Sequence, residues 1–293
     1  MLGEVLTAIV TPFAPDGSVN LDKFKELAAY LVEHGSDGVV VAGTTGESPT
    51  LSDDEKLALF AAAVEAVGDR ATVVAGTGTY DTGHSARLTE RVHELGVDGF
   101  LVVTPYYSRP PQRAIVRHFQ EIASRTDKPV VVYNIPSRVV INIEPDTIAE
   151  LAEIENVRAV KQANDDLDQA RLIPGLGLDL YAGDDNLVFP FLGLGGVGGV
   201  CVHTHIWGVQ TKEMVRRHKE GDLDGARRLN EEMAPAFDLL KVVTNPIAIK
   251  AALNLLGHEA GGYRLPMVDP TERELEQIRG CLERAGVLSA ASI

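Results

Sequence analysis

Short runs of apolar residues recur at regular intervals over the first two thirds of the chain. A segment with helical spacing of apolar positions follows each run. The runs are Leu6–Val10, Val39–Ala42, Thr72–Ala75, Phe100–Val103, Val130–Tyr133, Val157–Lys161, Asp179–Ala182 and Gly199–Val202. Their starts lie about 28 residues apart, which is the size of a compact unit of one strand and one helix. The pattern predicts repeated βα units.

These runs are continuous rather than alternating, as in Val39-Val40-Val41 and Val130-Val131-Val132. Strands that helices cover on both faces have this pattern, and such strands form parallel sheets. Units of similar length without an edge pattern favour a closed barrel over an open sheet. We therefore expect an α/β protein with a (β/α)8 TIM barrel over residues 1–222.

The strand-like runs stop after Gly221. Three amphipathic segments follow, Leu223–Val243, Pro246–Leu256 and Thr271–Ala285. They predict a C-terminal three-helix region over residues 223–293 that packs against the barrel.

Two helix starts inside the barrel carry sequence signals of their own. Ser52-Asp53-Asp54-Glu55 has the spacing of a capping box. Pro145 stands where the first turn of a helix is expected.

Composition and charge limit the partners of the chain. Hydrophobic residues make up 45% and charged residues 24%, as in a folded protein. The net charge of -15 repels phosphate backbones and anionic lipids, so we expect neither a nucleic-acid nor a membrane partner. The longest uncharged stretch, 186–202, is shorter than a bilayer span and rich in glycine.

The cysteines and the N-terminus indicate a cellular compartment. Cys201 and Cys281 form no C-x-x-C pattern, so neither a disulfide framework nor a thiolate metal site is indicated. The first residues lack the basic and apolar regions of a secretory signal. We expect a cytoplasmic protein.

A lysine and a tyrosine end two consecutive predicted strands. Tyr133 and Lys161 are 28 residues apart, one repeat unit, so they should be neighbours at the catalytic rim of the barrel. A sheltered lysine there is a candidate nucleophile for a carbonyl carbon, although most strand-end lysines are solvated or ion-paired. The nearest rival, Lys250, lies in a predicted helix outside the barrel, where we expect its amine to reach solvent.

Two other strand ends carry polar residues. The loop Gly43-Thr44-Thr45-Gly46-Glu47 offers backbone N–H groups that can bind a small carboxylate, or it is only a tight turn. The pair Tyr106-Tyr107 follows the fourth strand and either carries protons or fills an interface.

A zinc site is an alternative. His203 and His205 flank the last strand end, with Asp184 and Asp185 one strand away. The chain lacks H-E-x-x-H, a P-loop and a G-x-S-x-G elbow, so we expect no metal and no cofactor. A zinc-dependent barrel hydrolase is kept as a less favoured reading.

Taken together, these motifs resemble the dihydrodipicolinate synthase family of the N-acetylneuraminate lyase superfamily. The similarity also covers Gly76-Thr77-Gly78, Gly183-Asp184-Asp185, Asn245-Pro246-Ile247 and Arg264-Leu265-Pro266. It implies a class I lyase that condenses pyruvate with aspartate 4-semialdehyde to 4-hydroxy-tetrahydrodipicolinate, for diaminopimelate and lysine biosynthesis. It also implies a homotetramer built as a dimer of dimers.

The resemblance implies four catalytic residues. Lys161 would form the imine with pyruvate, and Tyr133 would relay protons. Thr44 would link Tyr133 to Tyr107, which in this family reaches across from the neighbouring subunit.

The resemblance also implies the substrate contacts. Thr44 and Thr45 would hold the pyruvate carboxylate, Arg138 the carboxylate of the aldehyde, and Gly183 and Val200 would line the pyruvate pocket. Sibling aldolases for keto sugar acids generally carry an apolar residue in place of Arg138, and such an aldolase is the first alternative.

Some positions depart from the family pattern. Val139-Val140 replaces Thr-Gly, Gln162 replaces a common Glu, and His203-Thr204-His205 stands where many members have a small residue and Asn. At the lysine-feedback site of the family, Ser48 and Tyr106 match. Lys56, Tyr80 and His84 do not, and a lysine at position 56 should repel the cationic inhibitor, so we expect weak inhibition by lysine.

Overall fold

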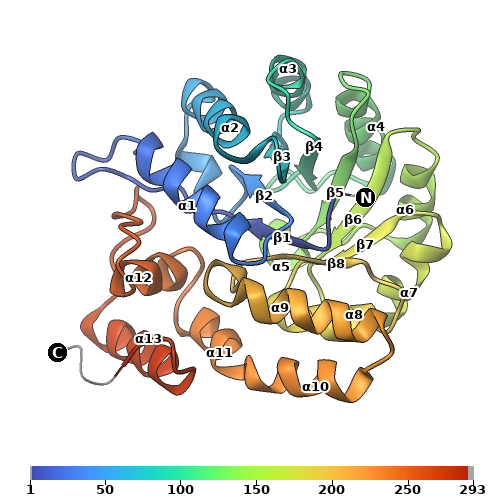
Figure 1. Ribbon diagram of the computed structural model, residues 1–293. Helices are drawn as coiled ribbons and strands as arrows, with labels where there is room; N and C mark the ends of the chain where they lie inside the picture. The colour runs from blue at the N-terminus through green and yellow to red at the C-terminus, as the bar shows by residue number, and fades with distance from the viewer. Residues whose placement is uncertain (1, 290–293) are drawn as a thin grey trace.

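The eight strands form one closed parallel barrel in the computed structural model, which describes residues 2–289 (Figure 1). The strands are β1 (Val5–Ala8), β2 (Gly38–Val41), β3 (Thr72–Gly76), β4 (Gly99–Val103), β5 (Val130–Asn134), β6 (Val157–Gln162), β7 (Asp179–Ala182) and β8 (Gly198–Cys201). Their order around the barrel follows the chain, and β1 closes on β8 with Leu6 opposite Val200. The predicted (β/α)8 barrel is confirmed, and each predicted strand overlaps an observed one.

Successive residues of each strand point to opposite sides of the barrel wall. Ala159 and Tyr133 belong to an apolar cluster inside the barrel, whereas Val160 and Val132 belong to the larger layer between strands and helices. Because side chains alternate with a period of two, Lys161 shares the inward face of β6 with Ala159.

Helices surround the barrel and continue beyond it. The α-helices are α1 (Leu21–Glu33), α2 (Asp53–Val67), α3 (Thr82–His93), α4 (Gln112–Ala123), α5 (Pro136–Val139), α6 (Pro145–Ala152), α7 (Leu167–Gly175), α8 (Val188–Leu192), α9 (Thr204–Lys219), α10 (Leu223–Glu232), α11 (Ala234–Val242), α12 (Ile247–Leu255) and α13 (Glu272–Arg284). Two short 3₁₀ helices, η1 (Ser48–Thr50) and η2 (Asp185–Leu187), lie in the loops after β2 and β7.

Both helix starts predicted from local signals are confirmed. Ser52 accepts a hydrogen bond from the Glu55 backbone N–H, while the Glu55 side chain accepts one from the Ser52 N–H, so the capping box opens α2. Pro145 is the first residue of α6.

The prediction of one helix over Leu223–Val243 is wrong in one respect, since the segment forms two helices. α10 ends at Glu232 and α11 begins at Ala234, with Met233 as the cap between them. Pro235 has no backbone N–H and its ring opposes continuation of a helix, so the break falls two residues before it and Pro235 lies in the first turn of α11. The other two predicted helices correspond to α12 and α13.

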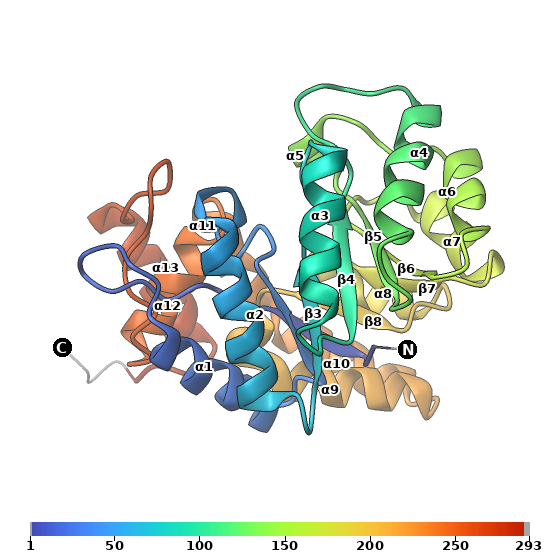
Figure 2. The same ribbon diagram turned by 90° about the horizontal axis from the view of Figure 1, so that it is seen from above.

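Helices α11, α12 and α13 lie together on one side of the barrel, away from α3, α4 and α6 (Figure 2). Phe13, in the loop after β1, forms an isolated β-bridge with Gly261, which follows α12. The C-terminal segment therefore reaches the loops at the catalytic rim. The domain boundary at residue 222 stays a prediction. Among residues 2–289, no helix has the length and apolarity needed to cross a membrane.

Candidate active site

Lys161 and Tyr133 lie side by side at the ends of β6 and β5. They pair in register, and the Lys161 Nζ lies 4.1 Å from the centroid of the Tyr133 ring. Each residue is only 5% exposed. The sequence predicted this adjacency, which places an amine and a phenol together inside the barrel rim.

A cavity opens above this pair at the C-terminal ends of the strands. Its polar and charged lining comes from Thr44, Ser48, Tyr106, Tyr133 and Arg138. Apolar and glycine positions complete it: Ala42, Gly43, Pro49, Gly76, Gly78, Leu101, Val103, Ile135 and Val139. A small compound in this cavity would contact Tyr133, whose ring lies against the Lys161 amine.

The loop after β2 folds as a compact turn around the Gly43 carbonyl. The Gly46 and Ser48 N–H groups donate to that oxygen over 3.1 and 3.3 Å, and Glu47 N–H donates to the Thr44 carbonyl over 3.1 Å. Glu47 adopts a left-handed backbone conformation, with φ of 55°. Thr45 is buried, and its hydroxyl accepts a hydrogen bond from the Asn245 amide over 2.8 Å. The loop therefore forms the tight turn that was one of the two interpretations of its sequence. This turn does not exclude that the loop also binds a ligand.

Arg138 lies on the short helix α5, at the opposite side of the cavity. Its side chain is largely exposed and lines the cavity together with the buried Val139. The structure shows no ion pair to Arg138 within residues 2–289, so its guanidinium is available to a ligand. Val140 ends this helix with φ of 69°, a conformation that glycine adopts more readily.

The two adjacent tyrosines separate. Tyr106 lines the cavity and packs edge-on against Tyr80 at a centroid distance of 5.2 Å. Tyr107 has φ of 70° and is 91% exposed. Within this one chain, Tyr107 therefore does not reach Thr44 or Tyr133.

The remaining predicted pocket residues, Gly183 and Val200, are not among those that line the cavity. Val200 is buried in the barrel interior on β8. Gly183 follows β7, where a side chain would collide with Ala163. Gln162 is on the opposite face of β6 from Lys161, and its amide bonds to Asn134, Asn164 and Gln169. This departure from the family pattern therefore does not touch the amine.

His203 and His205 do not form the zinc site considered above. The Val10 N–H donates to His205 Nε2 over 3.1 Å, and His205 Nδ1 donates to the Val202 carbonyl over 2.7 Å. His203 bonds to Asp185 through Nδ1 over 2.5 Å and to the Thr211 hydroxyl through Nε2 over 2.7 Å. All four ring nitrogens are occupied, and neither imidazole has a position left for a metal.

Asp185, Cys201 and His203 bring ligand atoms within 4.8 Å of one another, yet they do not suit a metal either. Burial and the nearby Asp185 raise the pKa of the Cys201 thiol well above its ordinary value, which keeps it protonated. One carboxylate oxygen of Asp185 also accepts the N–H groups of Val202 and His203. At the neighbouring Asp184, burial and Asp185 raise the pKa of the carboxyl group against the opposing effect of Lys161 and Arg138.

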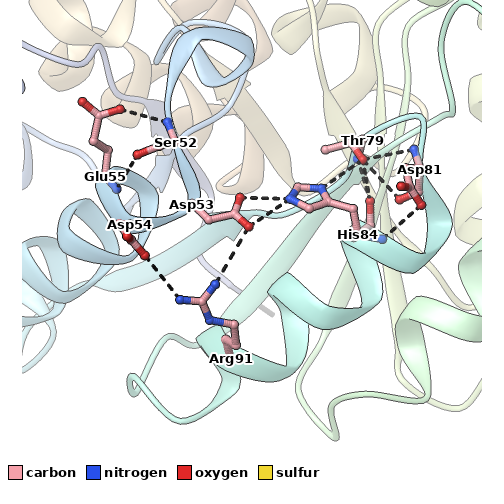
Figure 3. Close-up of polar contacts among 9 residues, drawn as sticks. Ser52, Asp53, Asp54, Glu55, Thr79, Asp81, His84 and Arg91 are labelled. Carbon is pink, nitrogen blue, oxygen red and sulfur yellow. Dashed lines mark hydrogen bonds and ion pairs between the residues drawn. The ribbon is translucent and has the colours of Figure 1, made fainter.

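His84, one of the residues at the expected lysine-feedback position, lies in a network of polar contacts between α3 and α2 (Figure 3). His84 Nε2 lies 2.9 Å from an Asp53 oxygen, and Arg91 approaches both Asp53 and Asp54. Lys56 is 5% exposed, and burial lowers the pKa of its ammonium group against the attraction of Asp53. Three basic side chains therefore lie in this region.

Lys250 contradicts the expectation that its amine reaches solvent. It is completely buried, and its Nζ lies 3.0 Å from a Glu47 carboxylate oxygen. Segments far apart in the chain enclose it, so its position in the sequence gave no signal of burial. The contacts of Glu47 with Lys250 and of Thr45 with Asn245 were likewise not predicted, although Thr45, Glu47 and Asn245 lie in motifs that carried the family resemblance.

Most of the chain matches the model of a known family. The model of the Dihydrodipicolinate synthetase family matches residues 1–285. The chain belongs to this family. A 4-hydroxy-tetrahydrodipicolinate synthase of Moorella thermoacetica is 49% identical to it over 98% of this chain and 99% of the relative.

Solved structures of the dihydrodipicolinate synthetase family share the fold. The synthase of Cyanidioschyzon merolae, solved with lysine bound, is 40% identical with a TM-score of 0.96, over 98% of this chain and 99% of that one. The chloride-inhibited synthase of Acinetobacter baumannii, complexed with pyruvate, is 33% identical with a TM-score of 0.95, over 98% of this chain and 100% of that one. The predicted family is confirmed, and the chain is a lyase of the 4-hydroxy-tetrahydrodipicolinate synthase type.

Proposed function

We propose that this enzyme condenses pyruvate with aspartate 4-semialdehyde through an imine on Lys161, giving 4-hydroxy-tetrahydrodipicolinate. The single observation that supports this mechanism is the inward-facing Lys161 amine against the ring of Tyr133, a residue that lines the cavity. The high-coverage relatives favour this reaction over the sugar-acid aldolase and the zinc hydrolase.

Lys161 begins the reaction as a nucleophile. Its unprotonated amine attacks C2 of pyruvate, and loss of water gives the imine. Removal of a proton from the pyruvate methyl group gives an enamine, whose carbon attacks the aldehyde carbon. The amino group of the semialdehyde then displaces Lys161 from C2, which closes the ring and frees the enzyme.

Tyr133 is the residue placed to move protons in these steps. Its ring lies against the amine and its side chain also lines the cavity. A phenol in that position can deliver a proton to the departing oxygen and take one back later. We propose that the Thr44 hydroxyl passes this proton onward to Tyr107 of a neighbouring subunit.

The two carboxylates of the substrates have separate binding groups in this proposal. The backbone N–H groups of Thr44 and Thr45, together with the surrounding Gly183 and Val200, hold pyruvate near the amine. Arg138 binds the carboxylate of the semialdehyde from the other side of the cavity. A full positive charge farther from Lys161 selects the second substrate without holding the first in place.

The exposed Tyr107 supports an oligomer in which one subunit completes the site of another. Tyr107 is 91% exposed and follows Tyr106, which lines the cavity, so its ring is free to contact a neighbouring subunit. We propose a homotetramer built as a dimer of dimers. Sedimentation velocity of the wild type and of Tyr107→Ala would test it, and a fully active monomer would exclude it. The cytoplasmic location stays a prediction.

Reductive trapping tests the proposed mechanism. The enzyme is treated with borohydride in the presence of pyruvate, digested and mapped by mass spectrometry. We expect a three-carbon adduct on Lys161 and none on Lys250, which serves as a matched control because it is also buried. An adduct elsewhere, or none, would overturn the mechanism.

A further inference from the structure

Glu47 and Lys250 form an ion pair that is sealed from solvent behind the catalytic loop after β2. The two side chains are 1% and 0% exposed, and they join residues that are 203 positions apart in the chain. Lys250 lies on α12, outside the barrel, whereas Glu47 ends the loop that carries Thr44 and Thr45.

Every donor of the Lys250 ammonium group has a partner. Besides Glu47, it donates to the Thr11 carbonyl over 2.9 Å and to the Gly262 carbonyl. The rings of Phe13 and Tyr263 face it at 4.4 and 5.1 Å from their centroids. The ammonium group therefore ties together the loop after β1, the loop after β2 and the segment after α12.

Both carboxylate oxygens of Glu47 also have hydrogen-bond partners. Its second carboxylate oxygen accepts the Arg264 backbone N–H over 3.1 Å. Its left-handed backbone, with φ of 55°, is unfavourable for a residue other than glycine. Such a conformation persists where surrounding contacts fix it, and it commonly does so near functional sites.

A second contact joins the same two parts of the chain. Asn245, just before α12, donates its amide to the Thr45 hydroxyl over 2.8 Å. On the barrel side, the Thr11 hydroxyl donates to the Gly46 carbonyl over 2.7 Å. The loop is thus fixed from the C-terminal region at Thr45 and at Glu47, on either side of Gly46.

A buried ion pair such as that of Glu47 and Lys250 is not explained by a gain in folding stability alone. Buried ion pairs can often be replaced by apolar residues of similar volume without loss of stability. The free energy needed to remove two charges from water is about as large as the free energy of their attraction. Their better attested use is to specify one arrangement of the chain. Here the pair fixes the loop after β2, whose Thr44 and Thr45 N–H groups hold pyruvate in the proposed function.

We propose that Glu47 and Lys250 are positioning residues for pyruvate: their ion pair sets the Thr44–Thr45 backbone at the distance from Lys161 that pyruvate binding requires. This inference rests on the proposed function. In this proposal, helix α12 of the C-terminal region contributes to the binding of pyruvate. Arg138 lies on α5, which the pair does not touch, so binding of the semialdehyde should not depend on it.

The decisive variant is the double substitution Glu47→Gln with Lys250→Met, which removes both charges and keeps the side-chain volumes similar. Borohydride trapping at Lys161 is measured as a function of pyruvate concentration. The half-saturating pyruvate concentration should rise about tenfold, as expected when a charge-assisted contact is misaligned. KM for the semialdehyde at saturating pyruvate should stay near the wild-type value. The thermal midpoint should fall, because the Thr11 and Gly262 carbonyls lose the donor that Lys250 gives them.

Lys212→Met is the matched control, because Lys212 pairs with Asp37 and Glu4 away from the cavity. It should leave the pyruvate dependence of trapping unchanged. A double variant with wild-type pyruvate dependence would overturn the proposal and leave Glu47 and Lys250 with a structural role only. Failure of the wild type to be trapped at Lys161 would instead refute the proposed function.

If the double variant does not fold, Glu47→Asp tests the same proposal. This substitution keeps the negative charge but shortens the side chain by one methylene group, which moves the carboxylate away from Lys250. A folded Glu47→Asp enzyme should also need more pyruvate for half-maximal trapping. Unchanged pyruvate dependence in that variant would likewise overturn the proposal.

Discussion

Tyr133 and Lys161 are paired residues of neighbouring parallel strands, and the lysine nitrogen lies over the tyrosine ring at 4.1 Å from its centroid. Because both side chains point into the barrel, their separation is set by the strand register and not by a flexible loop. This relationship makes the role of each residue separately testable.

Replacing the phenol should slow proton transfer and leave the lysine intact. Tyr133→Phe is expected to lower kcat about a hundredfold, the lower end of what general acid–base catalysis contributes. Pyruvate should still be trapped on Lys161 by borohydride. Steady-state kinetics with the two substrates would measure the loss.

Tyr181→Phe is the matched control for that variant. Tyr181 also faces into the barrel, on the strand beside Lys161, but its hydroxyl donates to the Gly3 carbonyl over 2.8 Å. This change should cost about 1 kcal/mol of stability and no activity. Equal activity losses in the two variants would contradict the role of Tyr133.

Arg138 should act on the second substrate only. Arg138→Leu removes a charge-assisted contact and should raise KM for aspartate 4-semialdehyde by about 10- to 100-fold. The pyruvate dependence of trapping should not change. The exposed Arg158, at the start of β6, offers the control Arg158→Leu, which should behave as wild type. A matching rise in both half-saturation values would argue against selective binding of the aldehyde.

Val140 stands in a left-handed conformation that a β-branched residue adopts only with strain. Val140→Gly should therefore stabilise the protein by about 0.5–1 kcal/mol, after allowance for the greater freedom of glycine in the unfolded chain. Denaturant midpoints of the two proteins would show the difference. A lower midpoint for the variant would mean that contacts of the Val140 side chain stabilise the fold by more free energy than the backbone strain costs.

Inhibition by lysine should be weak or absent. Lys56 and His84 place basic groups where a cationic effector would have to bind, and Asp53 is already paired with His84. The relative from Cyanidioschyzon merolae was solved with lysine bound, so the prediction separates this chain from that one. Initial rates measured across a series of lysine concentrations should not change. Strong allosteric inhibition would refute the prediction.

Stability should fall as the pH falls from neutrality towards 4. Burial lowers the pKa of His205 to about 4, from the ordinary value of 6.5. Below pH 6.5 the unfolded chain gains a proton at this imidazole while the folded chain does not, so unfolding becomes easier by up to about 3 kcal/mol. Urea midpoints at several pH values would record this slope.

Burial also lowers the pKa of His118 to about 4, so this residue adds a similar slope. His205→Gln should flatten the dependence between pH 6.5 and 4 because glutamine does not titrate. An unchanged slope in that variant would show that His205 does not carry the effect.

The sequence by itself determined the parts of this protein that depend on local patterns. Continuous apolar runs at a constant spacing specify strands covered on both faces, and their number specifies a closed barrel. The same spacing placed Tyr133 beside Lys161, since residues one unit apart end neighbouring strands at equal depth. The capping box of Ser52 and Glu55 is local too, because its partners are three residues apart.

Only the tertiary structure decided how distant segments meet. Lys250 looked like a surface lysine, yet α12 and the loops after β1 and β2 enclose it against Glu47. His203 and His205 looked like metal ligands, yet neighbouring backbone and side-chain groups occupy their nitrogens. Burial and hydrogen-bond partnership depend on contacts across some 200 residues, and no local periodicity encodes them.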